Sequence, residues 1–191
     1  KDKWDIKCPY TMTPIGLCIH NTANNASAAN EIAYMSNNNS EISFHFAVDN
    51  KEVIQAIPLN RNTWHSGDGA NGNGNRNYIS IEICYSTSND INLYNKSEEK
   101  AIELIVYLLK KYNWTVKNIK KHQDFNGKYC PHRILDNGWD SFIRKVESAL
   151  NQTQTPNKTT SKSDDLYRVR KEWNNPKSQL GAFKNLNNAI N

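Results

Sequence analysis

The sequence predicts one α/β domain, in which a mixed central β-sheet is flanked by helices, followed by a short C-terminal extension. Short runs of alternating apolar residues indicate strands, and longer segments with apolar residues at helical spacing indicate amphipathic helices. A polar stretch after residue 150 marks the end of this unit. A chain of 191 residues is long enough for one well-buried domain and an appendage.

The apolar patterns predict five strands, and the turn residues Asp49 and Asn50 join two of them into a hairpin. These strands cover residues 15–20, 43–49, 53–57, 78–85 and 119–122. On the second strand, alternation places Phe44, Phe46 and Val48 on one face. The Gly- and Asn-rich segment 60–77 predicts a loop.

Three helices are predicted from apolar spacing and capping residues. The first covers residues 27–35, with Ser27 as its N-cap. The clearest covers residues 95–114, where Asn95 and Glu98 have the spacing of a capping box. The last covers residues 139–150.

The domain boundaries follow from composition. Residues 1–150 are expected to form the main domain, and residues 151–165 contain no large apolar side chain and are predicted to be a flexible linker. Residues 166–191 return to strand-like alternation, and Asn175-Pro176 suits a helix start. This piece is short for a domain, so we expect a partial module. We also expect export by a route without a signal peptide, or a processed segment before Lys1, because the first nine residues lack an apolar core.

The composition limits the partners. The net charge of +5 favours an anionic partner, such as a phosphate-rich cell wall. The basic residues form no stripe with interleaved aromatic residues, so we expect no nucleic-acid partner. No run approaches the roughly 18 apolar residues of a membrane span. The four cysteines match neither a CxxC pair nor a disulfide framework, and Cys18 and Cys84 lie in apolar strands as expected for buried thiols.

Strand parity gathers polar residues on one side of the predicted sheet. His20, His45 and Glu82 each lie on the mixed face of a strand whose other face is strongly apolar. A carboxylate within an Ile-rich strand costs free energy unless it is paired or used, which singles out Glu82. Taken alone, each histidine also suits a structural role, and Glu82 also suits an ion pair.

A second polar cluster follows the fifth strand. His122 and Cys130 flank a short loop, and their imidazole and thiolate groups are ligands that zinc accepts. Lys128 precedes Cys130 by two residues, so in an extended segment both side chains point the same way. Together with His20, these residues are candidates for a metal site, although Cys130 alone equally suits a buried structural cysteine.

Several motifs in order make the chain recognisable. From about residue 10 to 148 it resembles the type 2 N-acetylmuramoyl-L-alanine amidases, a family that includes phage endolysins, bacterial autolysins and animal peptidoglycan recognition proteins. It is most similar to the endolysin and autolysin branch. The matching text is Ile19-His20-Asn21-Thr22-Ala23, Phe44-His45-Phe46, Trp64-His65-Ser66-Gly67-Asp68-Gly69, Ser80-Ile81-Glu82-Ile83 and the run from His122 to Leu135.

The resemblance implies a Zn²⁺ enzyme that hydrolyses bacterial peptidoglycan between N-acetylmuramic acid and L-alanine. Its implied zinc ligands are His20, His122 and Cys130, and its implied catalytic residues are Glu82 and Lys128. Substrate contacts are expected from Trp64, His65, Asn21 and His45. Some relatives carry an assisting Tyr where this chain has Phe44. We expect a monomer that acts on the cell wall after secretion, or that waits in the host cytoplasm if it is a phage endolysin.

Two other interpretations remain open. The chain can be a non-catalytic module that only binds peptidoglycan, or a cysteine peptidase that uses Cys130. The tail from Leu166 resembles sporulation-related wall-binding repeats. The sequence does not distinguish a phage endolysin from a host autolysin.

Overall fold

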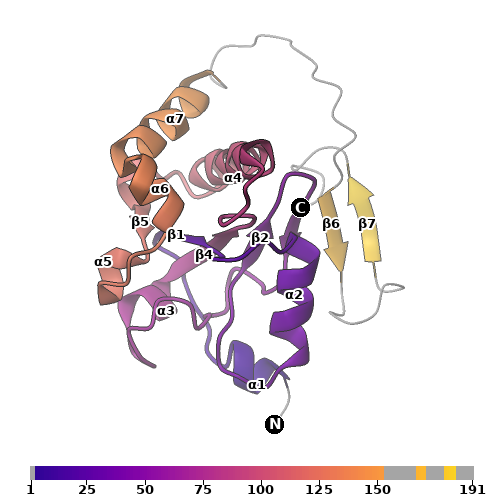
Figure 1. Ribbon diagram of the computed structural model, residues 1–191. Helices are drawn as coiled ribbons and strands as arrows, with labels where there is room; N and C mark the ends of the chain where they lie inside the picture. Colours follow the sequence, from indigo (N-terminus) through magenta and orange to yellow (C-terminus); the bar gives the residue numbers. More distant parts are fainter. Residues whose placement is uncertain (1–2, 153–166, 171–178, 184–191) are drawn as a thin grey trace.

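The central feature of the fold is a mixed β-sheet. The computed structural model describes residues 3–152, 167–170 and 179–183 (Figure 1). Across the sheet the strand order is β5-β1-β4-β2-β3-β6-β7. Strand β1 runs parallel to both β4 and β5, β4 runs parallel to β2, and the β2–β3 pair is antiparallel. The strands are β1 Gly16–Asn21, β2 Phe46–Val48, β3 Val53–Gln55, β4 Tyr78–Ile83, β5 Ile119–Lys121, β6 Tyr167–Arg170 and β7 Gln179–Phe183.

Helices cover both faces of this sheet, which confirms the predicted fold class. The long helix α4 (Ile91–Lys111) and α7 (Trp139–Gln152) pack with the isoleucine-rich face of β1 and β4 to form the main core. Helix α2 (Ala28–Asn37) forms a smaller core on the other face with Phe44, Ala47 and Cys84 (Figure 1). Short helical segments lie at α1 Lys3–Lys7, α3 Asn73–Asn77, η1 Val116–Asn118, α5 Gln123–Asn126 and α6 His132–Asn137.

Some element boundaries differ from the prediction. Helix α4 begins at Ile91 rather than Asn95, because the Asp90 side chain accepts a hydrogen bond from the Asn92 amide and caps the helix there. The proposed capping box of Asn95 and Glu98 was therefore wrong, since both lie inside the helix. Strand β2 begins only at Phe46, which leaves Phe44 free to pack with α2 instead of sharing the face of Phe46.

The structure tests only some of the predictions for the C-terminal part of the chain. Helix α7 extends through Gln152, so it includes the first two residues of the predicted linker, and the rest of that linker lies outside the described residues. Strands β6 and β7 pair antiparallel, and Arg168 of β6 pairs with Ile54 of β3. The predicted helix start at Asn175 also lies outside the described residues, and a separate C-terminal module stays a prediction. Among the described helices, none combines the length and the apolar character needed to cross a membrane.

The buried carboxylate of Asp49 joins the β2–β3 hairpin to the start of α2. One oxygen accepts a hydrogen bond from the Ala28 amide at 2.9 Å, and the other accepts from the amides of Lys51 and Glu52 at 2.7 and 2.8 Å. Asp49 is 2% exposed, so these charge-assisted bonds form largely away from water. A single side chain thereby fixes a turn and a helix that both border the polar side of the sheet.

We predict that Asp49→Ala lowers the free energy of unfolding by about 2–4 kcal/mol, because three amides lose their acceptor. The matched control is Asp90→Ala, which removes a cap at an exposed helix start and should cost about 1 kcal/mol. Chemical denaturation of both variants measures the difference. Equal losses would show that Asp49 is only another helix cap.

Candidate functional site

The site begins with two adjacent parallel strands. The register of β1 and β4 sets His20 beside Glu82 and, one step earlier on the same face, Cys18 beside Ser80. His20 Nδ1 lies 3.8 Å from Glu82 Oε1. The convergence expected from strand parity is therefore present for His20 and Glu82. The opposite face of the same strands carries the isoleucines of the core.

His122 and Cys130 reach the site from the segment after β5. The His122 amide donates to the Ile19 carbonyl, which holds it beside the end of β1. The Gln123 amide donates to the Cys130 carbonyl at 3.0 Å and closes the loop between the two residues. As a result, Cys130 Sγ lies 3.9 Å from His20 Nδ1, and the donor atoms of His20, His122 and Cys130 all lie within 4.8 Å of one another.

The donor set fits a zinc ion. Tetrahedral zinc with ordinary Zn–S and Zn–N bonds separates a sulfur ligand from a nitrogen ligand by about 3.6 Å, close to the 3.9 Å found here. His122 is 5% exposed, yet neither of its ring nitrogens makes a hydrogen bond of ordinary geometry among the described residues. Buried polar atoms without partners cost free energy, and a metal bond to one of them would remove part of that cost.

The protonation states also suit metal binding. Burial lowers the pKa of His20 well below its usual range, and the neighbouring His65, His122 and Lys128 act in the same direction. Burial and the Lys128 ammonium lower the pKa of His122 to about 4. Both imidazoles are therefore neutral at neutral pH and keep a lone pair available. Burial and the Glu82 carboxylate raise the pKa of Cys130 to about 12, so this thiol loses its proton only when a cation replaces it.

A cavity of about 400 Å³ opens beside this donor set, and Glu82 and Lys128 both line it. The Glu82 side chain is 16% exposed, and burial, then Glu31, raises its pKa to about 8, while Lys128 acts in the opposite direction. Lys128 is exposed and lies in the loop between α5 and Cys130, where the Cys130 amide donates to the Lys128 carbonyl at 2.7 Å. This tight turn differs from the extended backbone that the spacing of the two residues suggested. The cavity thus joins a proton acceptor, a fixed positive charge and three potential metal ligands.

Three of the expected substrate-binding residues, Asn21, Trp64 and His65, line the same cavity. The polar atoms of Asn21 are already engaged, because Oδ1 accepts from the Arg133 amide and Nδ2 donates to the Tyr94 hydroxyl. The Trp64 indole donates its N–H to the Ile6 carbonyl. Asn21 therefore holds the start of α6 in place, and Trp64 has only its ring surface to offer a ligand.

The structure does not bring His45 to the cavity. The side chain is 0% exposed, its Nε2 lies 2.9 Å from the Arg61 carbonyl, and its Nδ1 accepts from the Ser80 amide at 3.0 Å. Strand alternation predicted that His45 shares a face with Glu82. In the observed register, however, His45 lies beside Ser80, two residues before Glu82 on β4. With both ring nitrogens satisfied inside the core, His45 has no atom left for a substrate.

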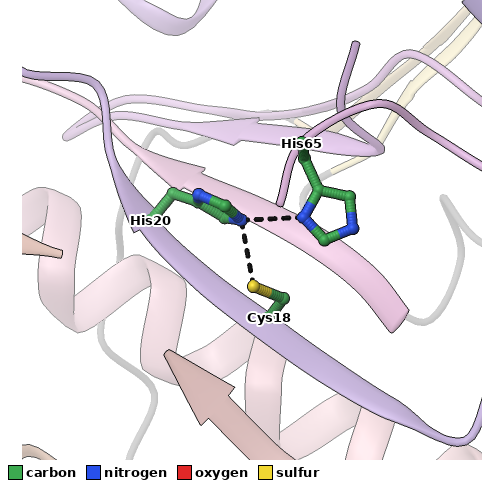
Figure 2. A group of neighbouring side chains, drawn as sticks. All are labelled: Cys18, His20 and His65. Carbon is green, nitrogen blue, oxygen red and sulfur yellow. Dashed lines mark hydrogen bonds between the residues drawn. The ribbon is translucent and has the colours of Figure 1, made fainter. Parts of the chain in front are cut away.

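His65 borders the cavity, but its polar atoms contact the protein. Figure 2 shows His65 Nδ1 joined to His20 Nε2, which in turn lies beside Cys18 Sγ; the distances are 3.0 and 3.1 Å. The other nitrogen, His65 Nε2, lies 3.0 Å from the Gly74 carbonyl oxygen. Burial lowers the pKa of His65 to about 3. Both ring nitrogens of His65 are therefore occupied by protein partners, and neither is free for the expected contact with substrate.

Sequence reasoning missed the structure around His65. The Gly- and Asn-rich segment, expected to be a plain loop, contains α3 and a dense set of side-chain hydrogen bonds. Asn75 Oδ1 accepts from the amides of His65 and Ser66, and Asp68 accepts from the amides of Gly74 and Asn75. Asp and Asn at short spacing among glycines were the available signal, since such side chains bind nearby amides.

The two buried histidines His45 and His122 should respond in opposite ways to truncation. We predict that His45→Ala lowers the free energy of unfolding by about 2–4 kcal/mol, because it opens a cavity and leaves buried polar groups unpaired. Its affinity for Zn²⁺ should stay unchanged. His122→Ala should leave the metal-free protein about as stable as before and weaken Zn²⁺ binding strongly. Denaturation in chelator and competition with a chromophoric chelator measure the two quantities, and a stable His45→Ala variant with weak Zn²⁺ binding would contradict this assignment.

Comparison with known proteins identifies the family of the chain. A model of the N-acetylmuramoyl-L-alanine amidase family matches residues 10–133. The chain is 55% identical over 151 residues to the N-acetylmuramoyl-L-alanine amidase CwlA of Bacillus subtilis (strain 168), an alignment that covers 78% of this chain and 55% of that protein. It is 52% identical over 171 residues to XlyB of the same strain, covering 88% and 54%. The chain thus spans about half the length of these curated relatives.

Solved structures show the same relationship. The structure of PlyL aligns with a TM-score of 0.72 at 51% identity, covering 75% of this chain and 90% of that one. The solution structure of the PlyG catalytic domain aligns with a TM-score of 0.73 at 50% identity, covering 81% and 93%. With a family model that spans most of the chain and relatives at this level of identity, the chain belongs to the N-acetylmuramoyl-L-alanine amidase family.

Proposed function

We propose that the chain is the catalytic domain of a zinc-dependent N-acetylmuramoyl-L-alanine amidase that cuts bacterial peptidoglycan between N-acetylmuramic acid and L-alanine. The observation that carries this proposal is the convergence of His20, His122 and Cys130 at the cavity that Glu82 and Lys128 line. The names of the relatives CwlA and XlyB support the substrate bond. The proposal includes action at the cell wall, as an autolysin or a phage endolysin, because that is where peptidoglycan lies.

The protein groups divide the chemistry between them. His20, His122 and Cys130 would hold the zinc, which when bound acidifies water and polarises the scissile carbonyl. Nearby positive charge favours the ionised form of Glu82, and in that form the carboxylate takes a proton from the attacking water. Burial makes this carboxylate a stronger base than an exposed one. The protonated Glu82 then gives this proton to the departing amine of L-alanine. The Lys128 ammonium stabilises the negative charge that develops on the carbonyl oxygen.

The cysteine peptidase interpretation fits the site less well. A nucleophilic cysteine needs a lowered pKa so that it exists as a thiolate. Burial and the neighbouring Glu82 raise the pKa of Cys130 instead, to about 12. A thiol in this environment suits metal binding, in which the cation replaces the proton.

We predict that Glu82→Gln reduces wall hydrolysis by about 10²- to 10⁴-fold, because it removes the general base. Zn²⁺ binding should persist, since the three ligands remain. Mass spectrometry of digested walls should show new L-alanine amino ends with the wild type, loss of this product in chelator and recovery with added Zn²⁺. Glu99→Gln, an exposed carboxyl on α4, is the matched control and should keep full activity.

Two outcomes would overturn the proposal. Activity that survives complete removal of the metal would exclude a zinc mechanism and restore the cysteine peptidase. Zinc-loaded protein that binds walls but releases no L-alanine amino ends would identify a peptidoglycan-binding module.

A further inference from the structure

The Gly74 carbonyl and the rings of His65 and His20 form a chain of hydrogen-bond contacts. The Gly74 carbonyl oxygen lies 3.0 Å from His65 Nε2, and His65 Nδ1 lies 3.0 Å from His20 Nε2. Both rings are buried, with His20 2% exposed and His65 8% exposed. The rings meet edge to face, at 85° between their planes (Figure 2). On the far side of the His20 ring, Nδ1 lies 3.9 Å from Cys130 Sγ.

The Gly74 carbonyl determines which nitrogens carry protons. A carbonyl oxygen can only accept, so His65 must carry its proton on Nε2. A neutral His65 then has a lone pair on Nδ1, and a second proton there would place a positive charge on a buried ring at high cost. His20 must therefore donate from Nε2 to His65 Nδ1. This leaves the lone pair of His20 on Nδ1.

We propose that His65, held by the Gly74 carbonyl, is the positioning residue that fixes the tautomer and ring orientation of the metal ligand His20. This inference rests on the proposed zinc function, because it describes how one ligand is prepared for the ion. An imidazole ligand whose second nitrogen donates to a fixed acceptor loses less freedom on binding and is a stronger base. The acceptor here is a second histidine rather than a carboxylate, so no net charge is added to the buried site.

The segment around α3 is built to hold this acceptor. The Asn75 side chain accepts from the His65 amide at 2.8 Å, and Asp68 Oδ2 accepts from the Gly74 amide at 2.6 Å. A Cβ on Gly74 would lie 2.5 Å from Ser66 Oγ and 2.6 Å from Ser66 Cβ, so only glycine allows this close approach. Asn75 and Asp68 thus hold His65 and the Gly74 backbone in place within one short segment.

Cys18 is the competing candidate for orienting His20, since its Sγ lies 3.1 Å from the same Nε2. A thiol is a weak donor and a weak acceptor. If Cys18 donated to Nε2, the lone pairs of His20 Nε2 and His65 Nδ1 would face each other at 3.0 Å. The Cys18 thiol therefore lies beside the His20–His65 hydrogen bond but does not determine the tautomer of His20.

The direct test is the tautomer of His20 in the metal-free wild-type protein. Long-range proton–nitrogen NMR of ¹⁵N-labelled protein distinguishes the two neutral forms. We expect both His20 and His65 to carry their protons on Nε2. A proton on Nδ1 of His20 would overturn the inference, whether or not the protein is a zinc enzyme. Failure of the wild type to bind Zn²⁺ would instead overturn the proposed function.

Variants provide the second test. His65→Phe keeps the ring but cannot accept a hydrogen bond, and we expect it to weaken Zn²⁺ binding by about 10- to 100-fold. His65→Gln offers a carbonyl acceptor and should recover part of this loss. His45→Gln, which changes a buried histidine that does not line the cavity, and Cys18→Ala should leave the affinity unchanged. Equal affinities in wild type and His65→Phe, or a loss in Cys18→Ala that matches it, would contradict the role of His65.

If His65→Phe does not fold, His65→Gln carries the affinity test. It should bind Zn²⁺ more weakly than the wild type, and its His20 should keep the Nε2 proton in the NMR spectrum. A His20 that shifts its proton to Nδ1 in this variant without any change in affinity would also contradict the inference.

Discussion

The site depends on the parallel register that places His20 of β1 beside Glu82 of β4. Strand β1 lies between β4 and β5, and all three run in the same direction. Their carboxyl ends therefore meet at one edge of the sheet, where ligand sites of α/β proteins commonly form. His122 follows β5 at this edge, and its amide is tied to the end of β1. A shift of one residue in β1 would turn His20 into the core and bring Ile19 to the site.

The two faces of the sheet divide stability from chemistry. One face buries the isoleucines of β1 and β4 against α4 and α7, which supplies the apolar burial that stabilises the domain. The other face carries neutral imidazoles, a thiol and a carboxylate whose charged forms burial disfavours. Burying such groups costs folding free energy, and proteins commonly accept this cost at a functional site. The strongly apolar face allows the fold to tolerate them.

The residues that strand and loop spacing could predict are those whose geometry is local. Alternation along single strands put His20 and Glu82 on one face, and the short spacing of Lys128 and Cys130 put both in one loop, although the backbone between them turns instead of extending. The register between neighbouring strands cannot be predicted in this way, because it depends on how the strands pair. His45 shares the face of Glu82 but lies beside Ser80, so its role could not be read from parity. The tertiary contacts of His65 were equally inaccessible, because its partners lie on β1 and in α3.

The start of α4 shows the same limit. The capping-box spacing of Asn95 and Glu98 was a sound local signal, but Asp90 caps the helix five residues before Asn95, and Tyr94 of the added turn is fully buried in the core. Burial of Tyr94 favours the longer helix over the local cap. Packing between elements therefore decided the boundary.

The most direct test of the account is the position of zinc in crystals of the metal-loaded protein, located by its anomalous scattering. We expect one fully occupied ion bonded to His20 Nδ1, to one ring nitrogen of His122 and to Cys130 Sγ. The sulfur should lie about 2.3 Å and the nitrogens about 2.0 Å from the ion. An ion held instead by Cys18, His20 Nε2 and His65, or no ordered zinc between His20, His122 and Cys130, would contradict the central claim.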